Sequence, residues 1–283
     1  MSPHRVVACS LAAGLLAWSG QACAGWVIDQ VMKGGGPEGR QQVVVQANRI
    51  KTVLLGPDGQ PAAAFILDLN AETITQVDYQ DRHSVTATIR EYAEMIRGAQ
   101  QAMSEQMGQA MKQMQEAVKD MPPEQRKAVE QMMRSQTPQA APAPQACRAP
   151  KVEVQKTDQQ ATVAGYPATR YDVQSDGKPE SEIWVTTSIT AWRELDPKKL
   201  EQFTTEMTKA MPRCGPAQGR PGLPMDDPSW KLLNEGYPVR TVILSGGGGT
   251  IEVIKAETRT LPASEFQPPA GFARKTLQEA MGR

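Results

Sequence analysis

The sequence has very little histidine and cysteine, which narrows the chemistry that the protein can perform. Among 283 residues there are two histidines and four cysteines, and aromatic residues make up 5% of the chain. After the first 24 residues only one histidine, His83, remains. HExxH zinc sites and centres built on several histidines are thereby excluded, and no GxSxG motif accompanies His83. We therefore expect no catalytic residue, no metal ion and no cofactor, and we interpret His83 as a solvated loop residue.

A net charge and a long apolar run are also missing. The chain carries 31 basic and 31 acidic residues. The only charged residue among the first 24 is Arg5, so their removal leaves a net charge of about −1. No positive field is available to attract nucleic acid. Beyond the first 24 residues no stretch approaches the ~18 apolar residues of a membrane-spanning helix. We therefore expect neither a nucleic-acid partner nor a transmembrane span in the mature chain.

The first 24 residues have the pattern of a secretory signal peptide. Arg5 is followed by an apolar run over residues 6–18 and by Ala-Cys-Ala at residues 22–24, small residues that a signal peptidase accepts. We predict cleavage after Ala24 and a periplasmic or secreted protein. Two alternatives stay open: a buried apolar helix, or a lipoprotein acylated at Cys23.

Two cysteines remain in the mature chain, Cys147 and Cys214. In an oxidising compartment an even pair favours a disulfide, which would stabilise the fold by on the order of 4 kcal/mol in the chain-entropy model. A redox-active pair would need CxxC spacing or a group that lowers a thiol pKa. Two free buried thiols are the other alternative.

Short runs rich in Val, Ile and Thr, separated by turn residues, predict antiparallel strands on both sides of a helical segment. The expected strands are residues 26–32, two strands within 42–55 that turn at 47–49, and 65–69, 73–77 and 84–88, followed later by 152–154, 160–164, 168–173, 183–187, 239–244 and 250–258. We interpret residues 25–283 as a single α+β domain built on a large, curved, antiparallel sheet.

The helical insert covers about residues 89–135. Residues 89–119 contain no proline and predict one long helix, and a second helix is expected from Pro123 to about Arg134. Residues 137–150 are rich in proline and alanine and are typical of a linker. Asp196-Pro197 predicts the start of a later helix, and residues 277–281 predict a short terminal one.

Methionines recur at spacings of three and four along the long helix, including Met103, Met107, Met111 and Met114. This stripe predicts an adaptable apolar face that packs on the concave face of the sheet as core or lid, or that binds a ligand or a partner. Thioethers also bind Cu(I), so a Met-based copper carrier is an alternative, although no His or Cys supports the metal there.

Several turn and strand-entry motifs resemble the domain of unknown function 4412, a family of exported bacterial proteins. The motifs are Gly165-Tyr-Pro, Glu182-Ile-Trp-Val, Gly236-Tyr-Pro-Val and Leu261-Pro-x-x-x-Phe266-x-x-Pro269-x-Gly271-Phe272. We expect the tyrosine of each Gly-Tyr-Pro motif to pack back on the sheet. The family resemblance implies no activity and no catalytic residue.

The order of elements is more distantly similar to the LolA/LolB-like fold of lipoprotein carriers and receptors, in which an incomplete barrel is covered by helices. From that likeness we expect a non-enzymatic envelope protein that binds an apolar ligand, such as a lipid or a lipoprotein acyl chain, or an apolar protein segment. The candidate residues are Met103, Met107, Met111 and Met114. A scaffolding module that binds another envelope protein is the alternative.

Overall fold

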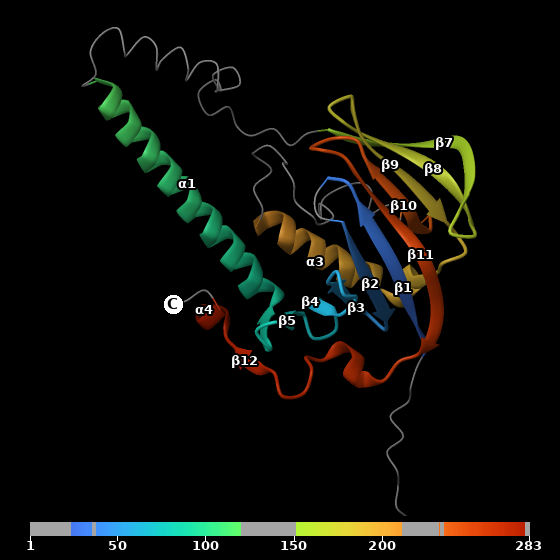
Figure 1. Cartoon of the computed structure of the whole chain (residues 1–283). Helices are drawn as coiled ribbons and strands as arrows, with labels where there is room; N and C mark the ends of the chain where they lie inside the picture. The colour runs from blue at the N-terminus through green and yellow to red at the C-terminus, as the bar shows by residue number, and fades with distance from the viewer. Residues whose placement is uncertain (1–23, 36–37, 120–150, 211–231, 233–234, 281–283) are drawn as a thin grey trace, which may run out of the picture.

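A computed structural model describes residues 24–35, 38–119, 151–210, 232 and 235–280 of the chain (Figure 1). Within these residues one open sheet has the strand order β12-β6-β5-β4-β3-β2-β1-β11-β10-β9-β8-β7. The strands are β1 (Ala24–Lys33), β2 (Gly39–Gln46), β3 (Arg49–Leu55), β4 (Pro61–Asp68), β5 (Thr73–Asp78), β6 (His83–Thr88), β7 (Val152–Val163), β8 (Tyr166–Ser175), β9 (Lys178–Thr186), β10 (Tyr237–Ile243), β11 (Gly249–Thr260) and β12 (Ala273–Lys275).

The sheet consists of two antiparallel meanders, β1–β6 and β7–β11, joined by the antiparallel pair of β1 and β11. Tight turns set the register of the hairpins, as at Ala47 and Asn48, which both adopt positive φ. Asp176 and Gly177 also adopt positive φ, in the turn between β8 and β9. The predicted turns at both places are confirmed, and so is the large, open, mostly antiparallel sheet.

Side chains alternate between the two faces of the sheet, and the register shows which residues share a face. Leu67 and Ile74 pair across β4 and β5 and pack against helices, so we call theirs the helix face. Ile66 and Thr75, one position along, lie on the opposite face. Residues 261–275, which we call the strap, cross that side and contribute to its apolar core, so we call it the strap face.

The helix face is covered by η1 (Ala191–Glu194) and α3 (Pro197–Ala210). Asp196 begins α3 as predicted: its Oδ1 accepts the backbone N–H of Lys198 at 2.9 Å. Phe203 and Met207 are buried against the sheet, which explains why α3 lies where it does.

The end of the chain returns along the strap face to the far edge of the first meander. After η3 (Ala263–Phe266), β12 pairs in parallel with β6, and α4 (Leu277–Ala280) follows. Three residues without an alternating pattern do not predict a strand, so β12 was missed in the sequence. None of the helices in the described part of the chain is long and apolar enough to cross a membrane.

The helix α1 (Ile89–Lys119) begins where the sequence predicts and is helical up to the last described residue of this stretch, but its placement differs from the expectation. Only its start contacts β5, β6 and α3, and in Figure 1 the rest projects away from the sheet. Met103, Met107 and Met114 are exposed. The predicted packing of these methionines on a concave face is therefore wrong, because α3 already occupies the helix face of the sheet.

The two short strands expected within residues 152–164 form one strand, β7, with an irregularity between Lys156 and Gln160. Several other predictions fall outside the described residues. They are the signal peptide, the second helix from Pro123, the linker at 137–150 and the disulfide between Cys147 and Cys214.

Candidate functional site

Three of the four candidate binding residues, Met103, Met107 and Met114, lie on one continuous seam of α1. Positions that alternate by four and three residues occupy one stripe of a helix with a period of 3.5, the spacing by which helices pair. In α1 the seam consists of Ile89, Ala93, Ile96, Gln100, Met103, Met107, Ala110, Met114 and Ala117. The sequence identified its methionines, but the structure shows that the seam begins inside the core.

The first part of the seam is anchored to the rest of the fold. Ile89 and Ala93 are buried in one cluster with Phe203 and Met207 of α3. Beside the seam, Tyr92 stacks edge-on against Phe65 of β4, with ring centroids 6.4 Å apart. These contacts fix the direction in which α1 leaves the sheet.

The second part of the seam is exposed. The side chains of Met103, Met107 and Met114 are exposed by 66%, 58% and 49%. Met111, which is at a flanking position of the helix, has a side chain outside the described set. Three large apolar side chains in one stripe form an exposed patch of the kind that marks an interaction site on a soluble protein.

The exposed part of the seam carries no charge. The charged residues of this stretch, Glu105 and Lys112, are exposed and lie about half a turn away from the methionines on the opposite side of the helix. A helix with a charged side and an apolar side is suited to bury the apolar side against another surface. The first part of the seam buries its apolar side against α3, whereas the apolar side of the second part is exposed.

A capping box holds the start of α1. Oε2 of Glu91 accepts hydrogen bonds from the backbone N–H and the hydroxyl of Thr88, both at 2.8 Å, and Oγ1 of Thr88 accepts the N–H of Glu91 at 3.1 Å. The hydrogen bonds from the backbone and then the hydroxyl of Thr88 lower the pKa of Glu91. The cap satisfies helix N–H groups that have no carbonyl partner.

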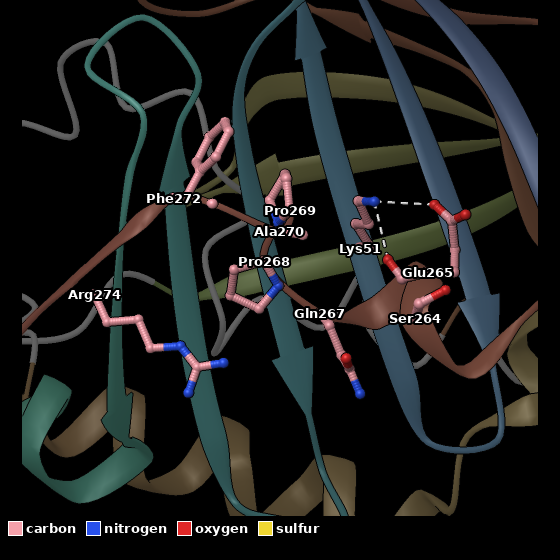
Figure 2. A pocket seen from close by; sticks show the side chains of 10 residues that line it. Lys51, Ser264, Glu265, Gln267, Pro268, Pro269, Ala270, Phe272 and Arg274 are labelled. Atoms are coloured by element: carbon pink, nitrogen blue, oxygen red, sulfur yellow. Dashed lines mark hydrogen bonds and ion pairs between the residues drawn. The ribbon is translucent and has the colours of Figure 1, made fainter.

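A cavity of about 430 Å³ opens where the strap crosses the sheet, and Figure 2 shows the side chains around it. Lys51 of β3 points into this region from the strap face. Its Nζ donates to the backbone carbonyl and to Oε1 of Glu265, each at 2.9 Å. The charge of Lys51 is thus neutralised by the strap. Pro269, Phe272 and Arg274 line other sides of the cavity.

Buried side chains tie the strap to the sheet. Leu261 and Phe266 belong to the strap-face core, and the guanidinium of Arg49 lies 4.5 Å from the centroid of the Phe266 ring. Phe272 packs edge-on against Tyr79, with ring centroids 5.6 Å apart. Leu261, Phe266 and Phe272, the apolar residues of the sequence motif, therefore make the contacts that hold the strap on the sheet.

The two Gly-Tyr-Pro motifs begin β8 and β10. Both tyrosines pack against the helix-face core, and the hydroxyl of Tyr166 donates to the carbonyl of Ala256 at 3.0 Å. Burial raises the pKa of Tyr237. A side chain at Gly236 would meet the carbonyl oxygen of Thr186 at 2.2 Å, so only glycine fits. The prediction that the tyrosines pack back on the sheet is confirmed.

These motifs lie inside a family match. The model of the domain of unknown function DUF4412 matches residues 87–272, about two thirds of the chain, from the end of β6 to the last apolar contact of the strap. The chain belongs to the DUF4412 family. No curated protein matches the sequence.

Three solved structures similar to this DUF4412 protein share 8–9% sequence identity with it. An uncharacterised conserved protein from Thermus thermophilus has a TM-score of 0.41, with 90% of this chain and 91% of that chain covered. PNGF-II has a TM-score of 0.38, with 92% and 32% covered. The MucA/MucB complex of Pseudomonas aeruginosa has a TM-score of 0.33, with 88% and 57% covered.

One further group of polar side chains gathers at the turn between β5 and β6 of this DUF4412 protein. Asp78, Asp81 and His83 bring ligand-type atoms within 4.8 Å of one another. Oδ1 of Asp78 accepts the backbone N–H of Asp81 at 2.8 Å, so this carboxylate already stabilises the turn. His83 is the first residue of β6 and half-buried, which corrects its interpretation as a solvated loop residue.

Proposed function

We propose that this protein is a non-enzymatic protein of the bacterial envelope that binds a helical segment of a partner protein along the exposed seam of α1. The observation that carries the proposal is the exposure of Met103, Met107 and Met114 on an uncharged stripe whose first part is anchored in the core. The leader-like first 24 residues support the location in the envelope.

The shape of the site favours a protein helix over an acyl chain. An acyl chain needs an enclosed apolar cavity, because its whole length must leave water. The helix face beneath α3 and η1 is filled by side chains such as Ile28, Ile189 and Val239, each 0% exposed. The apolar surface that is accessible runs along a helix, which matches the face of another helix.

The choice of methionine favours a partner over a second copy of this chain. Helices that pair permanently with themselves use Leu and β-branched residues at the seam, because these have defined shapes. Methionine has three rotatable bonds and a polarisable sulfur, so it adapts to the surface of a different protein. Ala110, between Met107 and Met114, and Ala117 after them are small enough to allow a close approach of the partner helix.

The proposal is tested by photocrosslinking in cells that express the full chain. A photoreactive residue in place of Met107 is expected to crosslink to one discrete protein, whereas the same residue in place of Glu105, on the opposite side of the helix, is not. A synthetic peptide from the crosslinked segment should then bind the purified protein. Equal crosslinking at both positions, or a product with twice the mass of this chain, would contradict the proposal.

Two triple variants distinguish the contribution of the apolar surface to binding from that of the sulfur atoms. The variant M103Q/M107Q/M114Q removes the apolar surface and should abolish binding of the peptide, whereas M103L/M107L/M114L retains that surface and should bind within about threefold of the original affinity. If the Leu variant loses binding and the purified protein takes up Cu(I), copper binding at the thioethers would replace our proposal. Saturable binding of a fluorescent fatty acid that is lost in the Gln variant would replace it with an acyl ligand.

A further inference from the structure

A second cavity, of about 390 Å³, lies on the strap face beside the one in Figure 2 and shares Pro268 and Arg274 with it. Its lining contains three hydroxyls, from Thr75, Ser84 and Thr86, and the cationic side chains of Arg274 and Lys275. Among the described residues no carboxylate lines it. The cavity thus offers hydrogen-bond donors and positive charge without a negative group of its own.

The hydroxyls of this cavity have protons to donate. Ser84 is 2% exposed, and its side chain makes no hydrogen bond within the described residues. Oγ1 of Thr75 and Oγ1 of Thr86 lie 2.9 Å apart and share one hydrogen bond. Two hydroxyls carry two protons and one bond uses one of them, so the other remains available. The Ser84 hydroxyl, which lines the cavity, therefore has its proton free for a ligand.

The cations that line the cavity have no ion-pair partner among the residues that the structure describes. In the parallel pairing of β12 with β6, Arg274 is aligned with Ser84, and Figure 2 shows its guanidinium over the face of the sheet. Neither Arg274 nor Lys275 forms an ion pair in the described part of the chain. The carboxylate of Glu279 accepts hydrogen bonds from the backbone N–H and the hydroxyl of Thr276 at 2.7 and 3.0 Å, and Lys275 adds only a smaller attraction to it. By contrast, Lys51 in the neighbouring cavity is paired with Glu265.

We propose that this cavity binds a phosphate or sulfate group of an organic molecule. The guanidinium of Arg274 can donate two parallel hydrogen bonds to two oxygens of such a group, while the hydroxyls donate to the others. The two neighbouring cavities share Pro268 and Arg274 and are each in the size range of small-molecule sites, so the rest of the molecule can lie beside these residues. The site is independent of the seam on α1.

Titration calorimetry of the full chain at low ionic strength tests the site with inorganic phosphate and with glycerol 3-phosphate as probes. Arg274→Gln should weaken binding at least about tenfold, because a charged, bidentate partner is lost. Ser84→Ala should weaken it about threefold. Lys178→Gln, a matched loss of an exposed charge on β9, should leave binding unchanged. Circular dichroism shows that each variant is folded.

Vesicles distinguish a free phosphate compound from a lipid headgroup. Binding to phosphatidylcholine vesicles only when they contain phosphatidylglycerol, and its loss in Arg274→Gln but not in Lys178→Gln, would assign the site to a lipid phosphate. Binding of glycerol 3-phosphate without binding to either vesicle would assign it to a soluble compound. No binding of any of these probes, or equal losses in Arg274→Gln and Lys178→Gln, would overturn the proposal.

Discussion

The two parts of α1 have the same repeat of seam positions but opposite surroundings. From Ile89 to Ile96 the seam packs into a cluster with α3, whereas from Met103 to Met114 it faces solvent. The residues differ as well: the anchored part uses small and branched side chains with fixed shapes, and the exposed part uses methionine. The start of α1 thus anchors the helix to the rest of the fold, and the following turns expose an apolar stripe to solvent.

The largest effect should come from a charge placed in the anchored part. Ala93 is 3% exposed, so Ala93→Asp buries a carboxylate without a partner and should lower the free energy of unfolding by about 3 kcal/mol. The matched change Ala102→Asp lies in the exposed part and should change the free energy of unfolding by less than about 0.5 kcal/mol. Urea denaturation of both variants measures the difference. Equal effects would show that the two parts do not differ in packing.

A comparable effect should come from the surface on which the anchored part rests. Phe203 of α3 is 2% exposed in the cluster with Ile89 and Ala93. Phe203→Ala removes this contact and leaves a cavity, which should cost about 3 kcal/mol. Thermal unfolding gives the stability, and hydrogen exchange should show faster opening at the start of α1. If the exchange of that segment does not change, the anchor does not depend on α3.

A smaller effect is expected at the cap. Thr88→Ala removes the hydroxyl that bonds Glu91 in both directions and should cost about 1 kcal/mol at neutral pH. The pKa of Glu91 is lower in the folded protein than in the unfolded chain. Its contribution is therefore present above the unfolded pKa and disappears as the pH falls through the folded pKa.

The difference in melting temperature between the original protein and Thr88→Ala should accordingly narrow in acid. Melting curves between neutral pH and about pH 3 follow this change across the ordinary carboxylate range. Glu91→Gln serves as the control, because it keeps the length of the side chain without its charge. A difference in melting temperature that widens in acid would mean that Glu91 does not act through its charge.

The smallest effect on stability should come from the exposed methionines themselves. The variant M103Q/M107Q/M114Q should change the free energy of unfolding by no more than about 0.5 kcal/mol, because these side chains bury little area in the free protein. Its effect on partner binding should nevertheless be large. A clear loss of stability in the purified variant would indicate that the seam is covered within the protein.

The sequence predicted local structure better than the placement of its pieces. The start of α1 at Ile89 and the start of α3 after Asp196 were predicted correctly, because caps and helix propensity act over a few neighbouring residues. The methionine stripe was found, but the expected packing of Met103 on the sheet was wrong. Periodicity identifies an apolar face without naming what covers it.

The strap-face cavity was not predicted at all. Ser84 and Arg274 are far apart in the chain and become neighbours only because β12 pairs with β6. The motif from Leu261 to Phe272 was visible as a pattern, yet nothing local shows that its apolar residues hold an irregular segment across the sheet. Long-range register depends on which surfaces remain to be covered once the meanders have formed.

The amino-acid sequence alone determined most of the strands, the turns between them, both helix starts and the uncharged stripe on α1, because these depend on neighbours in the chain. Only the tertiary structure decided that α3 covers the helix face, that α1 is held at one end, and that hydroxyls and cations from distant segments share a cavity. The reason is competition for one sheet: α3 and the strap pack on its two faces, and Met103, Met107 and Met114 of α1 remain exposed.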